Sequence, residues 1–218
     1  MALEPGSSLD RVGSTKGGRM YPINFTAGQA GERSRGLGWA GVFFFVKALL
    51  ALPHLIIVNI LGNLAFVVAY IGFFFVGFTG KLPDGLRSML VATMRWSART
   101  YAWVGALSDQ YPPFVWEEDD YPARLTVGDA PETPSRGLAW AGIFFIKFIL
   151  LIPHIVVMIF IYIGVLFAGW FGFWKIAFTG ESSQGIHNFI TGAIRWAMRV
   201  AAWFYGLTDE YPPFRLAE

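Results

Sequence analysis

Two long apolar stretches dominate the pattern of hydrophobic and polar positions along the chain. They run from residue 37 to 80 and from 138 to 180, and in the first only Lys47 is charged at neutral pH, apart from a proton that His54 could take up. Each stretch is about twice the roughly 20 apolar residues that cross the ~30 Å hydrocarbon core of a bilayer. We therefore expect each stretch to fold back on itself as a transmembrane helical hairpin.

The expected reversals lie near residues 61–63 and 162–164, which contain Gly62 and Gly164 and no Lys or Arg. A transmembrane barrel is excluded because the stretches are continuously apolar and do not alternate with a period of two.

The apolar stretches and the segments that flank them repeat after about one hundred residues. The chain is therefore two copies of one unit, residues 21–120 and 121–218, behind a Gly- and Ser-rich tail (1–20) that we expect to be flexible. The matching motifs are Arg35-Gly36-Leu37 with Arg136-Gly137-Leu138, Pro53-His54 with Pro153-His154, Phe78-Thr79-Gly80 with Phe178-Thr179-Gly180, and Tyr111-Pro112-Pro113-Phe114 with Tyr211-Pro212-Pro213-Phe214.

Each unit also predicts shorter elements around its apolar stretch. Residues 21–28 and 121–128 alternate apolar and polar positions and end at Gly, which is typical of short strands. Gly80 and Gly180 suit the left-handed cap that ends a helix. A third, amphipathic helix is expected to start near residues 83–84 and near residue 183.

These elements predict an all-α integral membrane protein with four transmembrane helices, an interfacial helix in each repeat and short cytoplasmic strands. Two crossings per repeat make the repeats parallel, related by a pseudo-twofold axis along the membrane normal. Lys and Arg are concentrated before, between and after the two hairpins, and the two reversals contain none. The positive-inside rule therefore predicts a multi-pass protein with both termini in the cytoplasm.

Composition and charge narrow the function classes. Hydrophobic residues make up 55% of the chain and charged residues 15%, against about 25% charged in soluble domains. The absence of cysteine excludes disulfides, thiol catalysis and thiolate metal sites. A net charge of +2 gives no argument for binding nucleic acid. No signal peptide is recognised, so we expect the first membrane helix to act as the targeting signal.

The third helix of each repeat combines Trp and Arg in a pattern that indicates an interfacial helix. Trp favours the headgroup level and Arg can reach lipid phosphates. The alternatives are an anchor that only fixes depth, a specific anionic-lipid site, and a surface for a partner's membrane helices. The residues are Arg95, Trp96, Arg99, Trp103, Arg195, Trp196, Arg199 and Trp203.

Lys47 and His54, with Lys147 and His154, are polar pairs inside the apolar stretches. Each pair is seven residues apart and therefore lies on one helix face, and ionisable groups in membrane spans are functional candidates. The structural interpretation is that each lysine reaches toward the phosphates and each histidine bonds the carbonyl that the preceding proline leaves free. The alternatives are an ion or proton path, a lipid-headgroup site, and a haem or metal held between His54 and His154.

Asp109 and Asp209 follow the third helices, where an acid is poorly placed for the helix dipole unless a cation pairs with it. We expect a structural clasp with arginines, Arg35 and Arg136 among them. The acidic run 117–120 is expected to be a solvated linker, with docking of a basic partner as the alternative.

No nucleophile and base set, phosphate loop or dinucleotide fingerprint is recognised. The sequence therefore predicts a non-enzymatic accessory or scaffold subunit without a cofactor or metal, bound to lipids and to integral membrane partners of a larger complex that we expect to handle lipids. The alternatives are a small transporter or channel lined by the Lys and His pairs, and a redox subunit with a bis-histidine haem.

The order of Arg, Pro-His, Phe-Thr-Gly, Arg-Trp with a second Arg, Asp and Tyr-Pro-Pro-Phe resembles the bacterial membrane protein family called Domain of Unknown Function four-three-eight-nine. The resemblance covers residues 21–114 and 121–214. It implies a protein of the bacterial inner membrane and implies no activity. Relatives often have Arg where Lys47 and Lys147 stand.

Overall fold

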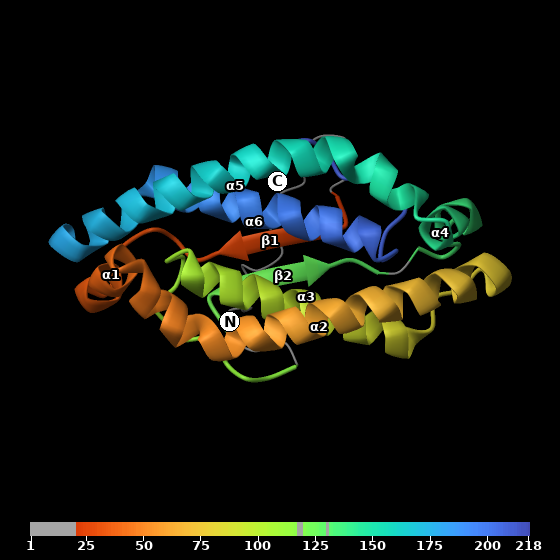
Figure 1. Cartoon of the computed structure of the whole chain (residues 1–218), viewed down its shortest axis with the longest axis horizontal. Helices are drawn as coiled ribbons and strands as arrows, with labels where there is room; N and C mark the ends of the chain where they lie inside the picture. The colour runs from red at the N-terminus through yellow and green to blue at the C-terminus, as the bar shows by residue number, and fades with distance from the viewer. Residues whose placement is uncertain (1–20, 117–119, 130) are drawn as a thin grey trace, which may run out of the picture.

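Each repeat contributes a strand, a short helix, a long helix and a third helix, in that order (Figure 1). The structure is a computed structural model, which describes residues 21–116, 120–129 and 131–218; the predicted tail (1–20) and residues 117–119 of the acidic linker lie outside them. The elements are β1 (Ile23–Ala27), α1 (Arg35–Val42), α2 (Phe44–Thr79), α3 (Asp84–Val104), β2 (Ala123–Val127), α4 (Arg136–Ile143), α5 (Ile146–Thr179) and α6 (Gln184–Phe204).

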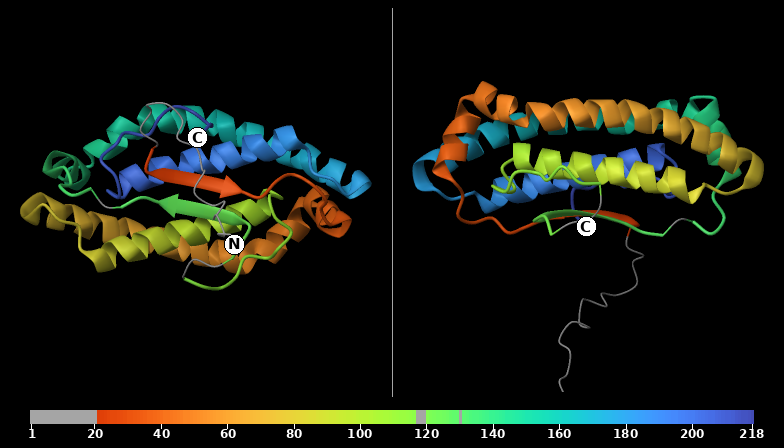
Figure 2. Two further views of the ribbon diagram at one scale, coloured as in Figure 1. Left: turned by 180° about the vertical axis from the view of Figure 1, so that it is seen from behind. Right: turned by 90° about the horizontal axis from the view of Figure 1, so that it is seen from below.

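The elements form three layers that lie parallel to one another (Figure 2). The long helices α2 and α5 make one outer layer, α3 and α6 the middle layer, and the strands β1 and β2 the other outer layer. Helix α3 packs along α2, and α6 packs along α5. The amphipathic helices therefore separate the two most apolar elements from the sheet.

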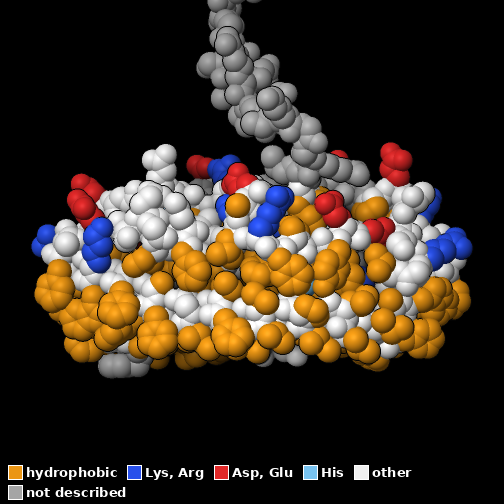
Figure 3. Space-filling view, turned by 90° about the horizontal axis from the view of Figure 1, so that it is seen from above, with side chains coloured by type: hydrophobic (Ala, Val, Ile, Leu, Met, Phe, Trp, Pro, Cys, Tyr) orange, Lys and Arg blue, Asp and Glu red, His pale blue; other side chains and the backbone are white. Residues whose placement is uncertain are grey.

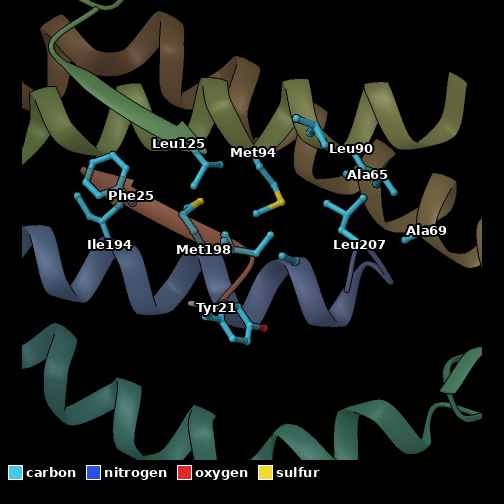
Figure 4. Packing of buried hydrophobic residues seen from close by; sticks show 14 of the residues in the cluster. Tyr21, Phe25, Ala65, Ala69, Leu90, Met94, Leu125, Ile194, Met198 and Leu207 are labelled. Carbon is cyan, nitrogen blue, oxygen red and sulfur yellow. The ribbon is translucent and has the colours of Figure 1, made fainter. Parts of the chain in front are cut away.

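The two predicted strands are confirmed, and they pair with each other. β1 and β2 are antiparallel, and the register places Phe25 opposite Leu125, its counterpart in the other repeat. A pseudo-twofold axis therefore passes through this pair and relates the two halves. The core lies between the sheet and the middle layer, where Phe25, Leu125, Met94 and Met198 are each at most 5% exposed (Figure 4).

The predicted hairpins are wrong, because α2 and α5 each run through the expected reversal as one helix of 36 and 34 residues. Nothing forces a turn there. The amide of Asn63 donates to the Asn59 carbonyl at 2.7 Å, one helical turn back, and a Cβ at Gly62 would meet nothing within 4 Å.

In the part of the chain that the structure describes, two candidate spans therefore replace the predicted four. By length and composition, the helical segments Val46–Thr79 and Ile146–Thr179 could each cross a membrane once. The predicted ends of these helices are confirmed, because Gly80 and Gly180 are left-handed caps with φ of 74° and 77°.

The short helices cross between the repeats. α1 packs on α5, and α4 packs on α2. Glycines allow this approach: a Cβ at Gly38 would lie 2.6 Å from the Ala177 backbone nitrogen, and one at Gly142 would lie 2.5 Å from the Phe73 ring. Each half therefore covers the carboxyl end of the other half's long helix.

Candidate functional site

Each repeat places its Pro-His pair in an aromatic cluster that is closed by the Tyr-Pro-Pro-Phe segment. In the second repeat, the Trp196 indole N–H donates to Nδ1 of His154 at 3.0 Å, and the Phe214 ring stacks on the imidazole with centroids 3.8 Å apart. His154 is fully buried. Since Nδ1 accepts a hydrogen bond, the neutral ring carries its proton on Nε2.

The first repeat has the same cluster. Trp96 donates to Nδ1 of His54 at 3.1 Å, and Phe114 stacks on the imidazole at 4.1 Å. The two histidines thus lie in separate clusters and are not brought together over a shared haem or metal. Within the described residues, no group of three or more His, Asp or Glu is placed to hold a metal ion.

The tyrosines of these segments tie the chain to the long helices. The Tyr111 hydroxyl donates to the Leu50 carbonyl at 2.9 Å, and Tyr211 donates to Leu150 at 2.7 Å. These carbonyls lie in the turn that precedes each proline. Each tyrosine therefore bonds the carbonyl next to the one that the proline leaves free, which belongs to Leu49 or Ile149. The sequence signal for this contact is the repeat of Tyr-Pro-Pro-Phe.

Both predicted lysines are buried and lie against aromatic rings from the two repeats. Nζ of Lys147 lies 4.7 Å from the Trp203 ring and 4.8 Å from the ring of Phe73, which belongs to the other repeat. It also donates to the Trp203 carbonyl at 2.6 Å. Lys47 lies over Trp103 and Phe173 in the same way.

Each lysine thus places its charge near the carboxyl end of a middle-layer helix, where the helix dipole favours a cation. This arrangement is a structural contact between the repeats. The structural interpretation had each lysine reach toward the phosphates; in this arrangement Lys47 and Lys147 are instead buried and contact protein.

The Trp and Arg residues of the third helices lie within the protein. Trp96, Trp103, Trp196 and Trp203 are 1–6% exposed, and Arg99, Arg195 and Arg199 are 1–8% exposed, while Arg95 is partly buried. Apart from the partly buried Arg95, these side chains are therefore packed inside the protein and are not exposed to lipid or solvent. The surface that could meet lipid is formed by other residues.

The arginines of α6 bind strand β1 and the carboxyl-terminal segment. Arg195 donates through Nε to the Phe25 carbonyl at 2.9 Å and through Nη1 to Leu216 at 2.8 Å. Arg199 donates to Ile23 at 3.2 Å and to Ala217 at 2.9 Å. In α3, Arg99 donates to the Val115 carbonyl at 2.6 Å.

Asp109 and Asp209 do fasten distant segments, with backbone N–H groups as partners. Asp109 accepts from the N–H of Ser34 at 2.6 Å, and Asp209 accepts from Ser135 at 2.7 Å. Both serines cap the short helices. Arg35 instead donates to the Thr179 carbonyl at 3.3 Å, and Arg136 lies beside Gly80.

The outer layer of α2 and α5 exposes a continuous apolar surface, which we call the apolar face. In the most apolar 18-residue stretch of α2 only 33% of the residues are buried, and in that of α5 only 11% are buried. In the space-filling view, hydrophobic side chains fill this side, while Lys, Arg, Asp and Glu gather on the side of the sheet (Figure 3). Residues at least 58% exposed on the face include Leu49, Ile60, Phe78, Ile149, Phe160, Leu166 and Phe167.

A family model described as a domain of unknown function (DUF4389) matches the chain twice, over residues 43–115 and 143–215. These two matches cover about two thirds of the sequence. The chain belongs to the DUF4389 family. No curated protein and no solved structure matches it.

The DUF4389 matches confirm the two tandem copies that the sequence predicts. Each match begins at the long helix and ends just after the Tyr-Pro-Pro-Phe segment. It therefore contains the Lys, His, Trp and Tyr contacts described above, while the strands and most of the short helices lie outside it.

Proposed function

We propose that this protein is a non-enzymatic accessory subunit of the bacterial inner membrane that lies in the plane of one leaflet. The apolar face lies among the acyl chains. The sheet side and both ends of the chain face the cytoplasm. The observation that carries this proposal is the segregation of exposed apolar residues on α2 and α5 from the charged residues on the opposite side (Figure 3).

Helix lengths support the in-plane arrangement. The 36 residues of α2 and the 34 of α5 span about 54 and 51 Å, far more than the ~30 Å hydrocarbon core. Since the middle layer and the sheet run parallel to them, an upright α2 would carry charged residues of the sheet side through the lipid, at a cost of several kcal/mol for each exposed charge. Lying flat, the same molecule keeps its charges in water.

Exposed apolar area of this extent marks an interaction surface. Lipid is the favoured partner because aliphatic and aromatic side chains cover the face along both helices, as in helices that lie at a membrane surface. The polar side is then free to contact other subunits, and we propose that the larger assembly handles lipids.

Depth measurements test the orientation. The chain has no cysteine, so nitroxide labels can be placed singly at Leu49, Ile60 and Phe78 of α2, which are 59–67% exposed. The first and last are about 43 Å apart along the helix. We expect equal depths in proteoliposomes, whereas a spanning helix would place Ile60 far deeper than the other two.

Charge substitutions test membrane binding itself. The double variant Ile60→Glu and Phe160→Glu should fail to float with liposomes, whereas the matched control Thr26→Glu and Thr126→Glu, on exposed positions of the strands, should float like the wild type. Flotation of the first variant would contradict the role of the apolar face.

Purification from native membranes in mild detergent tests the accessory role. We expect reproducible membrane protein partners with the tagged chain. A lone species of 24.3 kDa would contradict that role and leave the depth result to stand separately.

A further inference from the structure

An apolar groove lies between the two repeats, where α3 of the first repeat meets α5 and α6 of the second. The groove has a volume of about 430 Å³. Ile190, Ala193 and Ala197 of α6 form its floor, Tyr101 and Val104 of α3 one wall, and Tyr162 of α5 the other. Tyr101 and Tyr162 are 40% and 47% exposed, so the groove has an open rim.

The position that the pseudo-twofold axis relates to this groove carries larger side chains on its middle-layer helix. Val104 and Gly105 line the groove of about 430 Å³, and their counterparts in the second repeat are Phe204 and Tyr205. The Phe204 ring lies 4.8 Å from that of Phe148 and 6.1 Å from that of Phe66.

We propose that the groove binds one acyl chain of a membrane lipid, with the headgroup left outside. This proposal rests on the in-plane orientation above, because α5 both forms a wall of the groove and carries half of the apolar face. The groove is therefore continuous with the surface that meets the leaflet, and a chain can enter from the bilayer without crossing water.

The lining chemistry fits a hydrocarbon chain better than a polar ligand. Apart from the two tyrosine hydroxyls, its side chains are Val, Ile and Ala beside a glycine. Burial of an acyl methylene in such a lining is favoured by about 0.8 kcal/mol. The small residues Gly105, Ala193 and Ala197 leave the width that a chain needs.

The test compares Val104→Phe, which installs the residue of the other repeat, with the matched control Val67→Phe. Val67 is 51% exposed on α2, and its counterpart is Phe167, so the control adds the same ring to the apolar face and leaves the groove open. Native mass spectrometry after incubation with phosphatidylglycerol and phosphatidylethanolamine should show one lipid retained by the wild type and by Val67→Phe. Val104→Phe should retain about tenfold less, which corresponds to the loss of about two buried methylenes.

A photoactivatable phosphatidylcholine with a diazirine in its acyl chain gives an independent measurement. We expect adducts on the α6 floor in the wild type and in Val67→Phe, and their loss in Val104→Phe. If Val104→Phe does not fold, Ala197→Leu narrows the same groove from its floor and should also lose the adducts.

The outcomes separate the two proposals. All of these variants should float with liposomes; a wild type that does not float removes membrane embedding and the groove with it. A wild type that floats but retains no lipid, or a Val104→Phe variant that retains as much as the control, overturns the groove proposal alone.

Discussion

Nζ of Lys147 in α5 lies 4.8 Å from the ring centre of Phe73 in α2, so a buried cation of one repeat contacts an aromatic ring of the other. Lys47 and Phe173 repeat the contact at 4.6 Å. These pairs join the two long helices through side chains near the ends of the molecule, and they explain why a lysine is kept in an apolar stretch.

Replacing Lys147 with Met should destabilise the protein by about 1–3 kcal/mol, because the charged hydrogen bond from Nζ to the Trp203 carbonyl is lost and that carbonyl keeps only the Gly206 N–H as a donor. Lys147→Arg should retain most of the stability, since the guanidinium keeps the charge and its donors. Thermal unfolding in detergent measures both. Lys175→Met is the control, because Lys175 is exposed and its loss should change stability by less than about 0.5 kcal/mol. Equal melting of Lys147→Met and the wild type would contradict this prediction.

Trp196→Phe should destabilise the protein by about 1–3 kcal/mol, because Nδ1 of buried His154 is left without a donor. Nitrogen NMR of histidine-labelled protein should show the proton on Nε2 of His154 in the wild type. A resonance from protonated Nδ1 would be incompatible with the Trp196 contact. Trp170→Phe, at a 41% exposed position of the apolar face, should leave both measurements unchanged.

Two glycine substitutions should have opposite effects. Gly38→Ala should destabilise the protein by about 1–3 kcal/mol through overpacking, because its Cβ would lie 2.6 Å from the Ala177 backbone. Gly62→Ala should stabilise it by up to about 1 kcal/mol, because Ala is the better residue inside a continuous helix with free space around it. A strongly destabilising Gly62→Ala would indicate a reversal at that position after all.

His187 should make stability fall as the solution is acidified. Burial lowers its pKa from the ordinary value of 6.5, nearby Arg33 lowers it further, and a hydrogen bond with the Gly28 backbone opposes the shift. Below pH 6.5 the unfolded chain therefore binds more protons than the folded one, so this contribution is present above pH 6.5 and is lost as the pH falls through the folded pKa. Unfolding of His187→Gln between pH 7.5 and 5 should depend less on pH than that of the wild type. Identical slopes would show that His187 contributes nothing to the dependence.

Local signals predicted the strands, the third helices and the Gly80 and Gly180 caps, because each depends on a few neighbouring residues. The continuity of α2 could not be judged in this way. Gly62 and Asn63 are typical of turns, yet both are tolerated inside a helix when the surroundings favour it. Because about 20 apolar residues suffice for one crossing, a stretch twice that length was predicted to turn back, whereas α2 continues as one helix.

The sequence indicated candidate residues for the site but not the residues that they contact. The sequence singles out Lys47, His54 and their counterparts as unusual, but the rings of Phe73 and Phe173 come from the other repeat, which no local pattern indicates. The groove did have a signal in the sequence: Val104-Gly105 faces Phe204-Tyr205 when the copies are compared. The difference becomes meaningful only when the packing shows that these positions line or fill a cavity.

The crossing of α1 onto α5 and of α4 onto α2 has a consequence for how such a protein could arise. A chain with a single repeat would leave Gly38 and Gly41 facing no helix, and a second identical chain would supply that helix. Joining two such chains end to end fixes their pairing and releases the halves from having to match. The small Val104 beside the large Phe204 is a difference that a symmetric pair of identical chains could not have.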